Sequence, residues 1–113
     1  MDTTLIKDKR LFERIAVRLP LRFLDFGANK VGRAEVCDLS ASGLGLVSSE
    51  PLLPNTSLGV WLEIPDQGNP FYAQGSVVWS NAIAEDKHRI GVRLENPQLM
   101  GLGRVLRLNQ NFI

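Results

Sequence analysis

The sequence Asp38-Leu39-Ser40-Ala41-Ser42-Gly43 is a polar corner between two segments with the composition of β-strands. Asp and Ser side chains bond to local backbone and favour turns. A glycine such as Gly43 can adopt positive φ or let another group approach the backbone closely. We therefore expect a strand over about 31–37, a bend that carries a fixed carboxylate, and a second strand over 44–47.

Alternation of apolar and polar residues predicts the remaining strands. Residues 17–23 alternate cleanly, and Pro20 within them indicates an edge or a bulge because proline cannot donate to a ladder. Gly75, inside another expected strand, indicates a bulge or a place where a neighbouring group packs closely on the backbone. Short strands separated by turns of similar length predict an antiparallel barrel or sandwich. The other expected strands are 58–64, 71–80 and 87–94, with connections at 25–30, 65–70 and 81–86.

Near the end of the chain the spacing of apolar residues changes from that of a strand to that of a helix. Asn96-Pro97 is a favourable helix start, and it predicts a helix over about 97–112 that closes one end of the barrel. Gly101 and Gly103 weaken this helix by about 1 kcal/mol each relative to Ala. We expect a flexible lead-in over 1–8 and a single domain over 9–113, with its barrel at about 15–95. The apolar positions at helical spacing are Leu99, Leu102, Val105, Leu106 and Phe112.

The composition excludes several classes of protein. The 113 residues include 44% hydrophobic and 22% charged residues, as in an ordinary globular domain. Thirteen basic against twelve acidic residues give a net charge of +1, which argues against a protein that coats nucleic acid polymers. Cys37, the single cysteine, allows no intrachain disulfide and no cysteine-based zinc cluster. No signal peptide or membrane span is recognisable, so we expect a cytoplasmic protein without membrane insertion.

We expect no enzyme. His88 is the only histidine, and no nucleophile-elbow signature accompanies it, so a structural role in a strand is expected. No group of residues suits a metal ion, and no catalytic residue or cofactor is predicted.

A basic segment precedes the first expected strand and contains Arg10 and Arg14. An arginine can bridge the two acceptors on one edge of guanine, while the donors on the other edge suit a carboxylate such as Asp38. Phosphate oxygens suit a second arginine, a hydroxyl such as that of Ser40, or a backbone N–H near Gly43. These residues meet the needs of a guanine nucleotide. A solvated basic face is the alternative, because the four-residue arginine interval recurs elsewhere in the chain.

The order of these motifs resembles the PilZ domain family, receptors for the bacterial second messenger cyclic di-GMP. The resemblance rests on Arg10-x-x-x-Arg14 followed by Asp38-x-Ser40-x-x-Gly43. It extends to residues 75–79, to Ile90-Gly91-Val92 and to the terminal helix. It implies a six-stranded antiparallel β-barrel with a C-terminal α-helix.

The resemblance also implies roles for individual residues. Arg10 and Arg14 would hold guanine Hoogsteen edges and phosphates, and Asp38 would take the guanine donor edge. Ser40 and Gly43 would line the corner. Trp79 would lie against a base, although an aromatic at such a position is more often a packing residue. Lys9 would influence whether one or two stacked ligands bind. Two departures from the family pattern are Lys9 in place of an arginine and Glu13 beside Arg14, which would either orient Arg14 or compete with phosphate for it.

The sequence thus predicts a cyclic di-GMP receptor in second-messenger signalling, such as motility or biofilm control. Its N-terminal arginine segment would close on the corner and change the surface shown to a protein partner. A monomer or weak homodimer is expected, and Trp61, on a polar face, would mark a partner surface. One alternative is a PilZ-like adaptor for motility or pili that binds no nucleotide. A barrel that binds single-stranded nucleic acid is disfavoured by an aromatic content of 7%.

Overall fold

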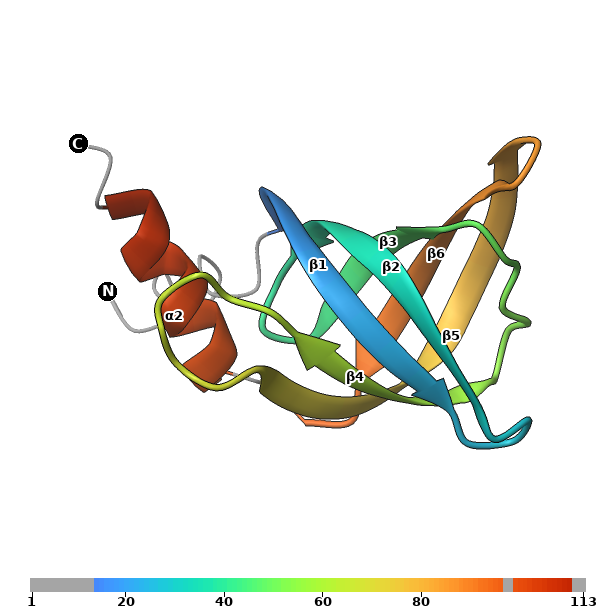
Figure 1. The fold of residues 1–113 in the computed structure, drawn as a ribbon, viewed down its shortest axis with the longest axis horizontal. Helices are drawn as coiled ribbons and strands as arrows, with labels where there is room; N and C mark the ends of the chain where they lie inside the picture. The colour runs from blue at the N-terminus through green and yellow to red at the C-terminus, as the bar shows by residue number, and fades with distance from the viewer. Residues whose placement is uncertain (1–13, 97–98, 111–113) are drawn as a thin grey trace, which may run out of the picture.

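The computed structural model describes residues 14–96 and 99–110, which form a closed antiparallel barrel followed by a helix (Figure 1). The strand order around the barrel is β1-β2-β3-β6-β5-β4. This confirms the predicted six-stranded barrel with a C-terminal helix. The elements are β1 (Ile15–Asp25), β2 (Lys30–Leu39), β3 (Gly43–Ser48), β4 (Ser57–Leu62), β5 (Phe71–Ala84), β6 (Lys87–Leu94) and α2 (Leu99–Gln110).

The alternating apolar residues fill the barrel, as the sequence pattern predicts. Leu21 and Phe23 of β1, Val60 of β4 and Ile90 and Val92 of β6 are almost fully buried there. Burial of such a side chain is worth about 1.5–3 kcal/mol. The inward faces of the strands therefore determine their pairing register.

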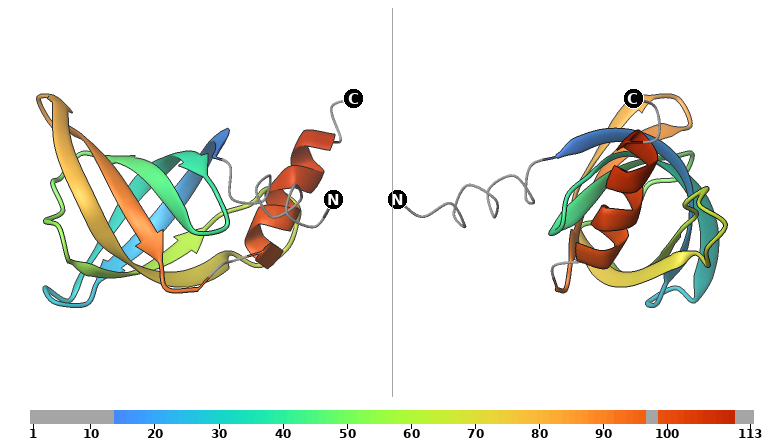
Figure 2. Two further views of the ribbon diagram at one scale, coloured as in Figure 1. Left: turned by 180° about the vertical axis from the view of Figure 1, so that it is seen from behind. Right: turned by 90° about the vertical axis from the view of Figure 1, so that its left-hand side faces the viewer.

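Helix α2 lies across one end of the barrel, as the views in Figure 2 show. Leu102 and Val105 are buried at this contact, which confirms the predicted plug. Gly101 allows the contact, because a Cβ on it would stand 2.6 Å from the ring of Phe71. Residues 97–98 and Phe112, which belong to the predicted helix, lie outside the described residues.

An ion pair joins α2 to the β4–β5 connection, which runs beside the helix in Figure 1. Arg104 donates from Nε to Asp66 Oδ2 over 2.7 Å and from Nη2 to Oδ1 over 2.6 Å. The Gly68 N–H also donates to Asp66. The Arg104 hydrogen bond, followed by that of Gly68, holds the pKa of Asp66 well below its usual value. No helix among the described residues is long and apolar enough to cross a membrane.

The expected connection at 81–86 is wrong, because β5 continues to Ala84. Asn81 pairs with Arg89 and Ala84 with Lys87 in β6, so only residues 85–86 form the turn. Asp86 has a φ of 57°, which suits a two-residue hairpin turn. The strand extends because β6 provides backbone partners that the composition of this segment does not reveal.

Pro20 lies where the barrel needs no backbone donor. It pairs with Glu35 of β2, and the ladder between β1 and β4 begins one residue later, at Leu21. The bulge in β1 falls earlier, between Ala16 and Leu19. Gly75 marks close packing rather than a bulge, since its Cβ would stand 2.4 Å from the Arg93 carbonyl oxygen.

Candidate ligand-binding site

A bulge in β2 turns the Asp38 side chain towards the outside of the barrel. Val36 pairs with Leu46 of β3 and Asp38 pairs with Gly45, so Cys37 is the extra residue. Strict alternation from the buried Val36 would point Asp38 inwards, and the extra residue reverses its direction. Leu39 then returns to the core, where it is 5% exposed. The strand thus places a carboxylate on the outer surface while its neighbours stay buried.

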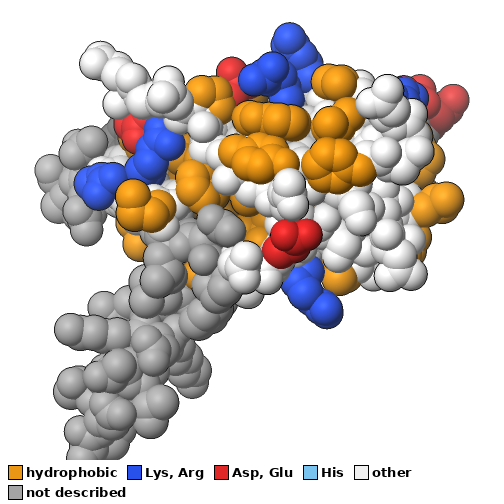
Figure 3. All heavy atoms as spheres, turned by 90° about the horizontal axis from the view of Figure 1, so that it is seen from below, with side chains coloured by type: hydrophobic (Ala, Val, Ile, Leu, Met, Phe, Trp, Pro, Cys, Tyr) orange, Lys and Arg blue, Asp and Glu red, His pale blue; other side chains and the backbone are white. Residues whose placement is uncertain are grey.

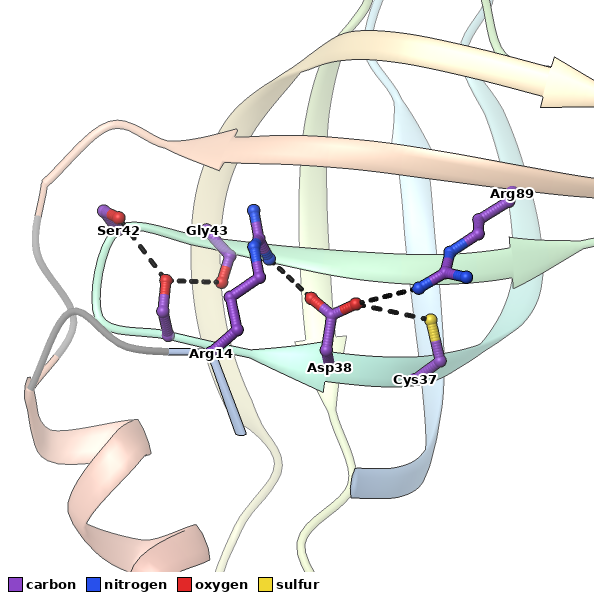
Figure 4. Close-up of polar contacts among 7 residues, drawn as sticks. Arg14, Cys37, Asp38, Ser42, Gly43 and Arg89 are labelled. Atoms are coloured by element: carbon purple, nitrogen blue, oxygen red, sulfur yellow. Dashed lines mark hydrogen bonds and ion pairs between the residues drawn. The ribbon is translucent and has the colours of Figure 1, made fainter. Parts of the chain in front are cut away.

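Two guanidinium groups flank this carboxylate, as Figure 4 shows. Arg14, just before β1, donates from Nη1 to Asp38 Oδ1 over 2.5 Å. Arg89 of β6 donates from Nη2 to the other oxygen, Oδ2, over 3.4 Å. The Cys37 thiol also lies 3.7 Å from Oδ2, and its pKa is raised by burial and then by the Asp38 charge. The carboxylate is therefore shared between residues from the start of β1 and from β6.

The corner after β2 is held by Ser40 and Gly43. The Ser40 N–H donates to the Gly43 carbonyl oxygen over 2.9 Å, and the Ser40 hydroxyl lies 3.4 Å from the same oxygen. Ser40 is 3% exposed. A Cβ on Gly43 would stand 2.6 Å from the Val92 carbonyl oxygen of the neighbouring strand. The serine closes the bend, and the glycine lets β3 approach β6.

A row of paired residues connects Asp38 with Trp79. Asp38 faces Gly45 of β3, Gly45 faces Gly91 of β6, and Gly91 faces Trp79 of β5. A Cβ on Gly45 would stand 2.6 Å from Asp38 Oδ2, and one on Gly91 would stand 2.3 Å from Trp79 Nε1. The carboxylate and the indole thus each lie over a glycine. We call this row the glycine floor, defined by Gly45 and Gly91.

Trp79 reaches this row through a second bulge. Val77 pairs with Val92 and Trp79 with Gly91, so Val78 is the extra residue in β5. Val77 is buried, whereas Trp79 is 38% exposed. Asp38 and Trp79, at the two ends of the glycine floor, therefore both point outwards because a bulge precedes them.

An open pocket of about 330 Å³ adjoins Arg14. Its walls come from the corner, from β5 and from β6, and Gly43 and Arg93 are among them. Pockets for small molecules commonly measure about 300–1,000 Å³. Arg14 is therefore placed between a pocket of ligand size and the Asp38 carboxylate.

The structure brings together most of the predicted site residues that it describes. Arg14, Asp38 and Gly43 surround one corner, and Trp79 lies at the other end of the glycine floor. Ser40 is adjacent but buried beneath the bend. Lys9 and Arg10, together with Glu13, lie outside the described residues.

Sequence reasoning missed Arg89 and the two glycines of the floor. Arg89 is 51 residues away from Asp38 in the chain and reaches it because β3 pairs with both β2 and β6. The motif Ile90-Gly91-Val92 is recognisable in the sequence, but the pairing of Gly91 with Gly45 depends on the strand order. The strand order β2-β3-β6-β5 is therefore needed to recognise that Arg89, Gly45 and Gly91 lie near Asp38.

Comparison with known proteins identifies the family. A family model for the PilZ domain matches residues 8–108, so the chain belongs to the PilZ domain family. A comparison with curated proteins gives no match.

Solved structures of PilZ proteins share the fold at low sequence identity. The PilZ domain of YcgR from Escherichia coli, solved with c-di-GMP, is 16% identical with a TM-score of 0.69, over 88% of this chain and 91% of that one. The motility inhibitor MotI/DgrA of Bacillus subtilis is 16% identical with a TM-score of 0.65, over 87% of this chain and 50% of that one. PlzA of Borreliella burgdorferi, solved in complex with c-di-GMP, is 15% identical with a TM-score of 0.57, over 92% of this chain and 42% of that one. The chain thus spans about half or less of the last two proteins.

Proposed function

We propose that this chain is a receptor for cyclic di-GMP, which binds at the corner formed by Arg14, Asp38 and Gly43. The observation that carries the proposal is the outward Asp38 carboxylate held against Arg14 beside an open pocket. Membership of the PilZ family supports it. Two of the similar structures, from Escherichia coli and Borreliella burgdorferi, contain c-di-GMP.

The chemistry of the corner suits guanine. A carboxylate accepts at two oxygens, so Asp38 can accept from the guanine N1–H and amino group. A guanidinium can bridge guanine N7 and O6 or hold a phosphate, and Arg14 fills this role. Arg89 adds a second guanidinium within reach of the same carboxylate. Trp79, at the far end of the glycine floor, offers an aromatic face to a base.

The Arg14–Asp38 ion pair does not prevent binding. The Arg14 side chain is 51% exposed and that of Asp38 is 18% exposed. Water can solvate the half-exposed Arg14 guanidinium as it turns to the ligand, and Arg89 stays 3.4 Å from Asp38 Oδ2. Until then the pair keeps both side chains close to the positions in which they are needed.

Residues of the N-terminal segment complete the proposal. Arg10, four residues before Arg14, would supply a further guanidinium to the base edge or the phosphates, and Lys9 would influence ligand stoichiometry. Closure of this segment on the ligand would change the surface shown to a protein partner. Ser40 would contribute by holding the bend, since its hydroxyl lies within 3.4 Å of the Gly43 carbonyl oxygen.

Calorimetric titration of cyclic di-GMP into wild type and Arg14→Ala tests the proposal. Loss of a bidentate arginine contact costs about 1–3 kcal/mol, which corresponds to a five- to 150-fold weaker affinity. Arg18→Ala is the matched control, because Arg18 follows Arg14 by four residues, lies on β1 and pairs instead with Glu35.

Equal affinity of wild type and Arg14→Ala would overturn the proposed site. Absence of binding to a folded wild-type chain would instead favour the alternative, a PilZ-like adaptor for motility or pili that binds no nucleotide. Affinity that falls in Arg14→Ala and stays unchanged in Arg18→Ala supports the receptor.

A further inference from the structure

A cluster of aromatic side chains lies on the outer surface of β4 and its neighbours, away from the glycine floor. Figure 3 shows hydrophobic side chains gathered in the middle of this face, with both basic and acidic side chains around them. The cluster consists of Phe26, Trp61 and Tyr72, and we call it the aromatic patch. Phe26 is 45% exposed and Tyr72 is 41% exposed, while Trp61 is half-buried.

The sheet holds these rings in place. Trp61 pairs with Tyr72 across β4 and β5, and their ring centroids are 4.8 Å apart at 44°. Gly59 leaves room for two of the aromatic side chains to pack against the sheet. A Cβ at this position would stand 3.1 Å from both the Phe26 ring and the Tyr72 hydroxyl oxygen. The patch is therefore built from the turn after β1 and from the paired strands β4 and β5.

Arg22 adjoins the patch, and Arg33 lies beside Arg22 on the next strand. The Arg22 guanidinium carbon lies 6.0 Å from the centroid of the Trp61 ring, and Arg33 faces Arg22 across β1 and β2. Neither arginine forms an ion pair with a carboxylate of the described residues. Like charges that face each other on paired strands are destabilising. Barrel stability does not explain this pair.

We propose that the aromatic patch, with Arg22 and Arg33, docks a partner protein through a segment that carries an apolar side chain flanked by carboxylates. Trp, Tyr and Arg are the residues that most often dominate binding energy at protein interfaces. The apolar side chain would lie on Trp61 and Tyr72. The partner's carboxylates would form ion pairs with the guanidinium groups of Arg22 and Arg33, so the two surfaces would be complementary in charge.

Two other occupants fit less well. A second copy of the chain would present the same patch with the same two arginines, and so would lack the charge complementarity that an acidic segment offers. Single-stranded nucleic acid needs separate aromatic faces along a basic groove. Here Trp61 and Tyr72 pack on each other, and the carboxylates of Glu63 and Glu35 lie two residues from Trp61 and Arg33, so the surface is not a continuous basic groove.

A titration with defined peptides tests the docking surface without any nucleotide. The probes are synthetic peptides with a central Leu-Phe or Trp-Leu pair flanked by Asp and Glu, and the same peptides flanked by Lys and Arg. The full chain is labelled with ¹⁵N, and its two indole N–H signals are assigned with Trp61→Phe. We expect acidic peptides to shift the Trp61 signal and leave the Trp79 signal in place. Binding should weaken as salt is raised, because it includes charge pairs.

Matched variants localise the binding. Arg22→Glu and Trp61→Ser should each weaken it at least tenfold. Ile83→Ser and Lys87→Glu, on the exposed β5–β6 hairpin, remove an apolar and a basic side chain elsewhere and should leave it unchanged. Melting curves confirm that each variant is folded.

Three results would overturn this inference. The first is that no acidic peptide binds wild type better than it binds Arg22→Glu. The second is that oligothymidylate, rather than a peptide, shifts the Trp61 signal. The third is a dimer in sedimentation that Trp61→Ser dissociates.

Discussion

At the scale of single residues, four glycines of β3, β5 and β6 separate into two kinds. At Gly43 a Cβ would meet the backbone carbonyl oxygen of Val92, and at Gly75 it would meet that of Arg93. At Gly45 and Gly91 the atoms nearest to a Cβ would belong to the side chains of Asp38 and Trp79. Backbone cannot move aside cheaply, whereas an exposed side chain can change its rotamer. The first kind is therefore required by the fold, and the second by the site.

Gly45→Ala should weaken cyclic di-GMP binding at least tenfold and leave the fold intact. The new methyl group would displace the Asp38 carboxylate, whose Oδ2 lies only 2.6 Å from the Cβ position. Calorimetric titration measures the affinity, and thermal melting measures the stability. Gly43→Ala is the contrast, because its clash with backbone should lower the melting temperature. Unaltered affinity in a folded Gly45→Ala variant would remove the glycine floor from the site.

At the scale of elements, the two bulges at the site, in β2 and β5, account for what the sequence does not reveal. Alternation predicts which residues of each strand face the core, since Leu21, Phe23, Ile90 and Val92 are buried as the pattern requires. It does not reveal that Cys37 is an extra residue and that Asp38 therefore points outwards. The position of a bulge depends on pairing between strands, and no local composition encodes that pairing.

The dependence on strand pairing also explains which site residues can be recognised from the sequence and which cannot. Arg14 and Asp38 are recognisable from the order of two motifs, and the structure brings them within 2.5 Å. Arg89 was visible only as one of several arginines at four-residue intervals, because its contact requires β6 to lie beside β3. The assignment of Lys9 and Arg10 stays a prediction.

Helix α2 contains two glycines that should respond in opposite ways to alanine. Gly103 has open space around its Cβ position, so Gly103→Ala should stabilise the protein by about 1 kcal/mol through helix propensity. At Gly101 the methyl group would stand 2.6 Å from the packed Phe71 ring, and such overpacking costs about 1–3 kcal/mol. Denaturant unfolding of both variants measures the difference. Equal gains at the two positions would show that α2 is not packed on Phe71.

The ion pair between Asp66 and Arg104 should make the attachment of α2 pH-dependent. The pKa of Asp66 is lower in the folded chain than its ordinary value of 3.8. A lowered folded-state pKa stabilises the protein above the ordinary value, and this contribution is lost as the pH falls below about 4. The advantage of wild type over Asp66→Asn in unfolding free energy should therefore be constant near neutrality and shrink in acid.

Unfolding by denaturant across this pH range provides the measurement. Glu85→Gln is the control, because it removes a carboxylate from the exposed β5–β6 turn without removing an ion pair among the described residues. A wild-type advantage that stays the same at all pH values would contradict the ionic attachment of the helix.

At the scale of the whole molecule, two outer faces carry two proposed activities. The nucleotide corner and glycine floor lie on β2, β3 and β6, and the aromatic patch lies around β4. Strands β1 and β5 belong to both faces, since β1 begins directly after Arg14 and carries Arg22, and β5 carries both Tyr72 and Trp79. The barrel thus offers a ligand surface and a partner surface on shared strands.

The central claim is that cyclic di-GMP binds at the corner and along the glycine floor, and an NMR titration of the ¹⁵N-labelled full chain tests it most directly. The account predicts that cyclic di-GMP shifts the backbone amide signals of Gly43, Gly45 and Gly91 and the indole signal of Trp79. The indole signal of Trp61 should stay in place. Shifts confined to the Trp61 face, or no shifts at saturating ligand, would contradict the account.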